Sequence, residues 1–101
     1  SEFFSNMKNS AYIFNLSRGP VINERHLENA IESKIIAGAG LDVTEIEPLP
    51  TNSKLLKLDN MIITPHALCW TDECFNDIAT EAINSILNFI DKKPISNQVN
   101  K

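Results

Sequence analysis

The sequence is poor in glycine, and this shortage limits what it can bind. It contains three glycines in 101 residues, Gly19, Gly38 and Gly40. No Gly-x-Gly-x-x-Gly motif exists, because position 43 is Val. That motif brings backbone amides at a helix N-terminus against a pyrophosphate. By itself, therefore, the chain has no cradle for the phosphates of a dinucleotide.

Cysteine and positive charge are also scarce. Two cysteines, Cys69 and Cys74, are too few for a disulfide scaffold. Together with His66 they lack a nearby fourth ligand, which argues against zinc or another metal. We expect reduced thiols in a cytoplasmic protein. The net charge of −4, with scattered Lys and Arg, argues against binding to nucleic acid through its phosphates.

No apolar run approaches the ~20 residues of a membrane span. The N-terminal residues have an early acid and no long apolar stretch, so we do not expect them to form a signal peptide. We therefore expect no membrane partner. With 43% hydrophobic residues, the chain is long enough for one small domain with a core.

The apolar pattern predicts three strands, at residues 11–16, 35–43 and 61–64. Asn23 is expected to cap a helix that ends near residues 33–34. A helical turn is expected around 53–58, and Thr71 is expected to cap a last helix that runs to about Asp91. This order predicts an α/β fold with a parallel sheet and right-handed crossovers. We assign residues 1–91 to the domain and 92–101 to a polar tail.

Two features of these strands leave questions open. Gly38, Gly40 and Asp42 share one face. Either a flat cofactor approaches that face and Asp42 accepts from its amide, or a helix packs tightly there and Asp42 caps a turn. Residues 11–16 are apolar on both faces, so we expect a central strand, whose second neighbour would have to come from further upstream.

Three polar residues follow the three strands, namely Arg18, Glu47 and His66. In parallel sheets, ligands bind outside the carboxyl ends of the strands. Arg18 is suited to a carboxylate, and His66 to acid–base chemistry. Each also has an ordinary interpretation, as a surface ion pair, a structural histidine or a solvated loop glutamate. Glu45 competes with Glu47 for a bond to the imidazole.

Three blocks of sequence, residues 15–24, 37–50 and 59–66, occur in an order and spacing that resemble the D-isomer-specific 2-hydroxyacid dehydrogenases. Residues 70–73 look like the branch that contains phosphoglycerate dehydrogenase-like and glycerate or hydroxypyruvate reductase-like members. The resemblance covers residues 7–90. It implies that the chain is the C-terminal half of a Rossmann-like, doubly wound parallel sheet, with about three strands plus helices.

The resemblance also implies catalytic roles. Arg18 would hold the carboxylate and carbonyl of a small 2-hydroxy or 2-oxo acid. His66 would give a proton to the substrate oxygen during reduction and take one during oxidation. Glu47, the acid that directly precedes a proline, would hold the imidazole and favour its charged form.

The implied cofactor is NAD, with NADP left open. Asp42 would face the nicotinamide amide, and bulk at residues 67–69 would narrow the nicotinamide site. The residues implied to line the cofactor are Leu16, Ser17, Arg18, Asp42, His66 and Cys69.

By the same resemblance, the phosphate-binding half and the substrate domain lie outside this sequence. We expect the 101-residue chain alone to be inactive and the full-length protein to be a homodimeric dehydrogenase. An alternative of another class is a co-repressor-like module that senses the nicotinamide cofactor without turnover. Turnover by the full-length protein distinguishes the two.

Overall fold

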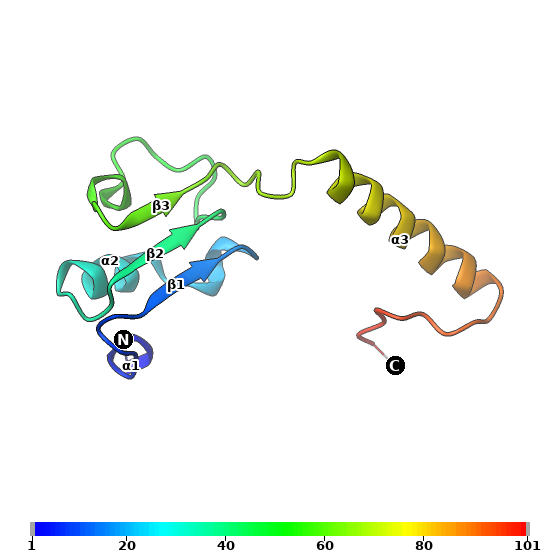
Figure 1. Ribbon diagram of the computed structural model, residues 1–101, viewed down its shortest axis with the longest axis horizontal. Helices are drawn as coiled ribbons and strands as arrows, with labels where there is room; N and C mark the ends of the chain where they lie inside the picture. Colours follow the sequence, from blue (N-terminus) through cyan, green and yellow to red (C-terminus); the bar gives the residue numbers. More distant parts are fainter. Residues whose placement is uncertain (1, 101) are drawn as a thin grey trace. The chain divides into compact units, whose positions relative to one another are not determined.

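The computed structural model describes residues 2–100 and contains two compact units, one ending at Leu68 and the other beginning at Cys69. Figure 1 shows the sheet in the first unit and a long helix in the second. The two units are distinguished by how densely each packs within itself. The expected boundary at residue 91, between the domain and its polar tail, is a separate matter and stays a prediction.

The first unit is a three-stranded parallel sheet with helices. Its strands are β1 (Tyr12–Asn15), β2 (Gly38–Leu41) and β3 (Met61–Ile63), in the order β1-β2-β3. The helices are α1 (Glu2–Ser5) and α2 (Glu24–Glu32), with 3₁₀ turns η1 (Gly19–Val21) and η2 (Lys54–Lys57). The α/β class and the parallel sheet predicted from the sequence are confirmed (Figure 1).

One face of the sheet packs against α2 to form the core. The caps fit the prediction, since the Asn23 side chain accepts from the His26 amide at the start of α2. Leu27, Ala30 and Ile31 from α2 are buried. Ala39 and Leu41 of β2 lie in the same cluster. The core thus fixes the strands, and with them the loops at their carboxyl ends.

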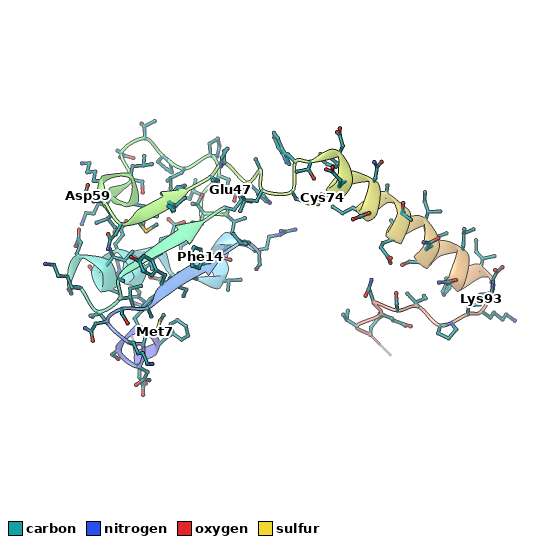
Figure 2. The ribbon with its side chains drawn as sticks, in the orientation of Figure 1. Met7, Phe14, Glu47, Asp59, Cys74 and Lys93 are labelled. Carbon is teal, nitrogen blue, oxygen red and sulfur yellow. A yellow bond between two sulfur atoms is a disulfide. The ribbon has the colours of Figure 1, made fainter. Side chains whose placement is uncertain are left out.

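The other face of the sheet is apolar and exposed. In the register, Tyr12 pairs with Gly38 and Phe14 pairs with Gly40. A Cβ on either glycine would meet the neighbouring ring at under 3 Å, so the two rings lie against bare backbone. Figure 2 labels Phe14 on β1. Phe14 is nevertheless 64% exposed. Aromatic rings of β1 therefore cover the two glycines on this face.

Within the described residues β2 lies between β1 and β3. The expectation that the first strand is central, with a second neighbour from further upstream, stays a prediction. Both faces of β1 are apolar, and among these residues β2 is its single partner. The second strand is shorter than the expected 35–43. The amides of Ile35 and Ile36 donate to Ala30 O at the end of α2, so these residues finish the helix instead of joining the ladder.

The second unit contains α3 (Asp72–Ile90), and Thr71 caps it by accepting from the Cys74 amide, as predicted. Its apolar stripe is present, but none of its described residues is buried. Within residues 2–100, no helix combines the length and the apolar character that a membrane crossing requires.

Cys69 and Cys74 form a disulfide, which corrects the expectation of reduced thiols. Their five-residue separation across a helix start brings the two sulfurs together.

Candidate active site

His66 and Glu47 form a hydrogen-bonded pair beyond the carboxyl ends of the strands. The distance from His66 Nδ1 to Glu47 Oε2 is 2.8 Å. Their side chains are 47% and 39% exposed, so both are open to solvent and to a ligand. Figure 2 places Glu47 just past the arrowheads of β2 and β3. The pair thus lies where parallel sheets bind their ligands.

The charge of Glu47 sets the proton arrangement of this pair. The bond to His66, followed by a bond from the Thr44 amide, lowers the pKa of Glu47 below its usual value. Thr44 N–H donates to Oε1 at 3.1 Å. An ionised carboxylate can only accept, so Nδ1 of the imidazole donates. The Nε2 atom of His66 is therefore the nitrogen left for a substrate.

Glu45, the competing acid, belongs to a different network. Its Oε1 accepts from the Glu24 amide at 3.1 Å, and its own amide donates to Glu24 Oε1 at 2.5 Å. Burial and the nearby Glu45 charge raise the pKa of Glu24, with burial the larger cause. These two hydrogen bonds hold Glu45 at the first turn of α2. Glu47, and not Glu45, is therefore the acid that binds the His66 imidazole.

Asp42 holds the segment that carries His66. Its Oδ1 accepts from the Thr64 hydroxyl at 2.5 Å and the Ala67 amide at 3.0 Å, and its Oδ2 accepts from the Leu68 amide at 3.2 Å. The Thr64 bond is the largest cause that lowers the pKa of Asp42. The sequence left two roles open for Asp42, a contact with a cofactor amide or a cap for a turn. The structure shows the cap, because Asp42 binds the amides of Ala67 and Leu68 in the turn after His66.

The same carboxylate retains room for one more donor. An ionised carboxylate offers about four acceptor positions, and three are used here. The free position is on Oδ2, and Asp42 borders the cavity described below. Asp42 is 5% exposed, so a further donor would have to reach it from this cavity.

His66 has a left-handed backbone conformation, with φ of 54°. A residue with a side chain adopts this region at a cost of about 1–3 kcal/mol and needs surrounding contacts to hold it. The two amides that follow His66 are the ones that Asp42 binds. Asp42 is therefore positioned to stabilise the conformation that aims the imidazole at Glu47.

Arg18 lies at the end of β1, in a turn that the buried Asn15 organises. Asn15 Nδ2 donates to Arg18 O at 2.9 Å, and Asn15 Oδ1 accepts from the Ser17 amide at 3.2 Å. Arg18 is exposed, and its Nη1 donates to Ser17 O at 2.6 Å. Its charge also contributes to the lowered pKa of Glu47. The three polar residues thus occupy the same edge of the sheet.

Gly19 allows the Arg18 turn to approach the Glu47 loop. A Cβ on Gly19 would lie 1.9 Å from Thr44 O and 2.6 Å from the Glu45 amide nitrogen. Only a residue without a side chain permits this approach of two backbones. Since Thr44 in turn binds Glu47, Gly19 links the turn after β1 to the acid that holds the imidazole.

A cavity of about 590 Å³ opens beside His66 and Glu47. It combines polar groups from the strand ends with an apolar wall from the loop after β2. The lining residues are Asp42, Thr44, Glu47, Pro48, Leu49, Leu56, Ile63, Thr64, Pro65 and His66. Its size suits a small organic ligand or part of a larger one.

Sequence reasoning missed two residues that shape this edge, Asn15 and Thr64. Asn15 is 4% exposed within a strand that otherwise reads as apolar. A polar residue at the last position of a buried strand is a usable signal, because a buried amide must be hydrogen-bonded.

Of the residues expected to line a cofactor, Leu16 and Ser17 are exposed at the end of β1. Cys69 belongs to the second unit and its sulfur is bonded to Cys74.

Comparison with known proteins identifies the family. Residues 1–67 match the family described as D-isomer specific 2-hydroxyacid dehydrogenase, NAD binding domain. The human glyoxylate reductase/hydroxypyruvate reductase is 42% identical over 98 residues, which are 97% of this chain and 30% of the relative. A probable 2-ketogluconate reductase of Dictyostelium discoideum is 43% identical over 97 residues, covering 96% and 29%. The chain thus spans about 30% of the length of these curated relatives.

Solved structures agree with this assignment. A D-isomer specific 2-hydroxyacid dehydrogenase from Xanthobacter autotrophicus Py2, in complex with NADPH and MES, matches with a TM-score of 0.74 and 36% identity. The match covers 98% of this chain and 40% of that one. A probable 2-hydroxyacid dehydrogenase from Rhizobium etli CFN 42, in complex with NADP, HEPES and L(+)-tartaric acid, matches with a TM-score of 0.80 and 29% identity. This match covers 98% of this chain and 32% of that one.

These matches confirm the resemblance that the three sequence blocks suggested. The family match ends at residue 67, directly after the residue that pairs with Glu47, so it includes the edge of the sheet described above. The chain belongs to the D-isomer specific 2-hydroxyacid dehydrogenase family, with residues 1–67 in its NAD-binding domain.

Proposed function

We propose that the protein containing this chain interconverts a small D-2-hydroxy acid and its 2-oxo acid with a nicotinamide cofactor. The observation that carries the proposal is the hydrogen bond of 2.8 Å between His66 Nδ1 and Glu47 Oε2 at the carboxyl edge of a parallel sheet. A pair of this kind orients an imidazole and fixes which nitrogen faces the ligand.

His66 is the acid–base group in this proposal. With Nδ1 donating to Glu47, the proton that moves is on Nε2. During reduction Nε2–H gives its proton to the substrate oxygen, and during oxidation neutral Nε2 removes it. Glu47 touches no substrate and acts as the positioning residue, since its negative charge favours the imidazolium that reduction requires.

Arg18 binds the substrate acid. Its guanidinium donates to Ser17 O, and its remaining N–H groups are free to form a bidentate contact with a carboxylate. Asn15 fixes the turn from which Arg18 projects. A lysine at this position would keep the charge but lose the paired geometry.

The residues present fit the nicotinamide end of the cofactor and not its phosphates. Asp42 offers one free acceptor position, which suits the carboxamide, and the exposed backbone at Leu16 and Ser17 offers a surface for the ring. When bound, the nicotinamide supplies or accepts the hydride. The sequence has no Gly-x-Gly-x-x-Gly motif for the phosphates.

The wider setting follows from the resemblance and is part of the same proposal. We place the full-length protein in the cytoplasm as a homodimer that acts on small acids. Among relatives, the printed names include glyoxylate, hydroxypyruvate and 2-ketogluconate reductases. Those three 2-oxo acids are therefore the first substrates to assay, with NADH and NADPH in parallel.

The test uses the full-length protein and compares two histidine variants. His66→Gln should lower kcat for reduction of its best 2-oxo acid by about 10²–10⁴-fold, the usual share of a positioned acid–base group. His26→Gln is the matched control, because His26 is the other histidine of the chain and lies in α2. Equal activity of the two variants would reject the role of His66.

Arg18→Lys tests substrate binding in the same protein. We expect a raised KM for the 2-oxo acid, because the bidentate contact is lost while the charge stays. The unmodified full-length protein distinguishes the two functions. If it binds the nicotinamide cofactor but turns over none of the small 2-oxo acids, a nicotinamide-sensing module is favoured over an enzyme.

Glu47→Gln tests the positioning role through the pH profile. Without the negative charge the imidazolium is less stabilised, so activity in reduction should be lost at a lower pH than in the wild type. Glu45→Gln is the control, since Glu45 binds the Glu24 amide and should leave the profile unchanged. A shift with Glu45→Gln alone would reverse the assignment.

A further inference from the structure

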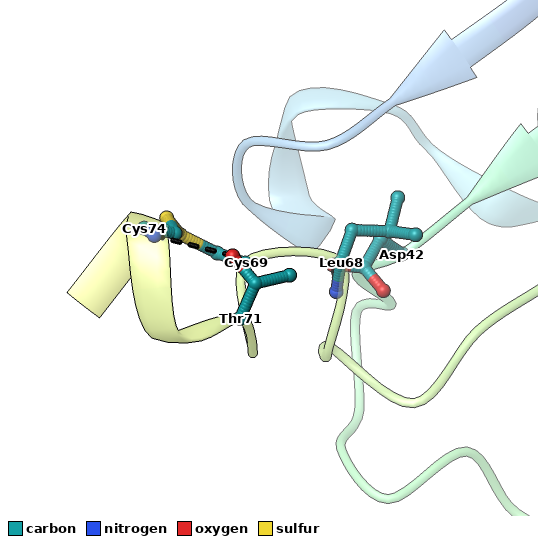
Figure 3. The surroundings of a disulfide bond; sticks show 5 residues. All are labelled: Asp42, Leu68, Cys69, Thr71 and Cys74. Carbon is teal, nitrogen blue, oxygen red and sulfur yellow. Dashed lines mark hydrogen bonds between the residues drawn. A yellow bond between two sulfur atoms is a disulfide. The ribbon is translucent and has the colours of Figure 1, made fainter. Parts of the chain in front are cut away.

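The disulfide between Cys69 and Cys74 has no part in the proposed hydride transfer. Its two Cα atoms are 5.7 Å apart, inside the range that a disulfide spans without backbone movement. The bond closes a short ring that includes residues 70–73 (Figure 3). Thr71 lies inside this ring, and its hydroxyl accepts from the Cys74 amide at 3.1 Å.

The ring occupies a defined place along the chain. It begins directly after Leu68, whose amide is held by Asp42 at 3.2 Å. It ends in the first turn of α3, where Cys74 is the third helical residue. The disulfide thus restrains residues 69–74, while Asp42 binds the amides of Ala67 and Leu68. Breaking the disulfide would release Cys69 and Trp70 from these restraints and leave the Thr71 cap in place.

The bond is open to reagents. Cys69 is exposed and Cys74 is half-buried. Exposed disulfides are the ones that thiols reduce readily, whereas buried structural ones resist. In reducing compartments, disulfides are typically transient and serve redox sensing or catalysis. An exposed pair in a protein that we place in the cytoplasm therefore fits a bond that opens and closes.

We propose that Cys69 and Cys74 form a reversible dithiol–disulfide site that reacts with a dithiol reductant. One thiolate of the reductant attacks Sγ of the more exposed Cys69, and the S–S bond breaks. Cys74 leaves as a thiolate and takes up a proton. The second thiol of the reductant then attacks the mixed disulfide and releases Cys69 as a thiol. The chain gains two electrons and two protons, and the reductant loses the same number.

The direction of attack follows from the positions of the two cysteines. A helix N-terminus carries a partial positive charge that favours a thiolate in the first turn. This attraction opposes the repulsion from the adjacent Asp72 and Glu73. Cys69 lies outside the helix and is the more exposed of the two, so its Sγ is the sulfur that a reductant reaches first.

Trp70 makes the site measurable. It is the single tryptophan of the chain, lies inside the ring and is 71% exposed. A neighbouring disulfide quenches indole fluorescence by accepting an electron from the excited ring, and two thiols quench it less. The emission of Trp70 should therefore rise when the pair is reduced and fall when it is oxidised again.

The experiment equilibrates the purified full-length protein in mixtures of reduced and oxidised dithiothreitol under native conditions, with the serine variants below as the reference for the Trp70 signal. Alkylation and mass spectrometry count free thiols at Cys69 and Cys74, while fluorescence follows Trp70. We expect both signals to change together, from zero to two alkylated thiols, and to return when oxidised dithiothreitol is added. Far-UV circular dichroism should stay nearly constant, because the Thr71 cap keeps α3 intact.

Cys69→Ser and Cys74→Ser are the matched controls. Each keeps one thiol and cannot close the ring, so Trp70 emission should not respond to the redox mixture. A bond that resists excess dithiothreitol until urea is added would overturn the proposal in favour of an inert structural disulfide. Two thiols that stay alkylatable in oxidised dithiothreitol would overturn it too, and so would a fluorescence response that survives in the serine variants.

Discussion

Two helices of this chain have the same local signals but different surroundings. Both α2 and α3 begin with a side-chain cap, Asn23 for one and Thr71 for the other, and both have an apolar stripe. In α2 the stripe is buried, and Leu27 has no exposed area. In α3 no described residue is buried, and Ile83 is 57% exposed. Capping and periodicity therefore decide that a helix forms, whereas burial depends on a partner surface.

The difference extends to how each region is stabilised. The first unit has a core that contains buried side chains of α2 and β2, and Gly19 meets the Thr44 backbone. The described part of the second unit has a capped helix, one disulfide and an ion pair between Lys93 and Asp91. Tertiary packing supplies most of the stability of ordinary helices. We therefore expect the two regions to respond differently to the same kind of substitution.

The largest contrast should come from removing one large apolar side chain in each helix. Leu27→Ala should cost about 2–5 kcal/mol of the free energy of unfolding, because it leaves a cavity in the core. Ile83→Ala should stay within about 0.5 kcal/mol, because an exposed side chain loses no packing. Urea unfolding, with hydrogen exchange in peptides from 24–32 and 72–90, measures each helix separately. Equal losses would mean that the apolar stripe of α3 is buried in solution.

The next effect comes from adding atoms in each region. Gly19→Ala places a methyl group against Thr44 O, which forces the two backbones apart. We expect a loss of roughly 1–3 kcal/mol, the usual cost of overpacking. Ala82→Leu, on the exposed face of α3, is the matched enlargement and should have little effect. Urea midpoints of both variants test the contrast, and an undisturbed midpoint for Gly19→Ala would contradict the close approach.

Caps should show a smaller difference. Asn23→Ala and Thr71→Ala each remove the acceptor of a helix-start amide, at 3.0 Å and 3.1 Å in the structure. Each should cost about 1 kcal/mol. In the first unit this loss should lower the stability of the whole sheet. In the second it should only fray the first turn of α3, visible as faster hydrogen exchange near Cys74. A loss of sheet stability with Thr71→Ala would show that the two regions are coupled.

The smallest effect is a pH dependence of the first unit. The folded state lowers the pKa of Asp42 and Glu47 below their usual values of 3.8 and 4.5. Their contribution to stability is therefore complete above these usual values and is lost as the pH falls through the lower folded-state values. The urea midpoint should fall in acid as Asp42 and Glu47 take up protons. Glu47→Gln should reduce this fall, whereas an unchanged curve would contradict the role of the Glu47 bonds.

Much of the candidate site was readable in the sequence because strand ends are marked by local residues. Arg18, Glu47 and His66 each follow an apolar segment, and parallel strands place such residues at one edge. The sequence blocks also pointed to the family that the comparisons confirm. The roles of the three residues remain predictions that the variants above test. The choice between Glu45 and Glu47 rested on the resemblance, and the structure gives it a geometric basis through the Glu24 pairing.

Other features depended on contacts between distant segments. Asn15 and Thr64 are ordinary in the sequence, yet Asn15 shapes the Arg18 turn and Thr64 binds Asp42. The strand predicted over 35–43 was too long because the end of α2 takes the amides of Ile35 and Ile36. The expectation of free thiols was wrong, since a helix start brings Cys69 and Cys74 within bonding distance.

The sequence by itself determined that two capped helices and three strands form, and in which order, because caps, turn residues and apolar periodicity act over a few neighbouring residues. It also determined which side chains reach the carboxyl edge of the sheet. Tertiary structure decided which helix is buried and which acid holds His66. Those outcomes depend on residues 20 or so positions apart, such as Asp42 with Ala67 and Glu47 with His66. Their energies come from burial and hydrogen bonds that exist only when the segments are packed together.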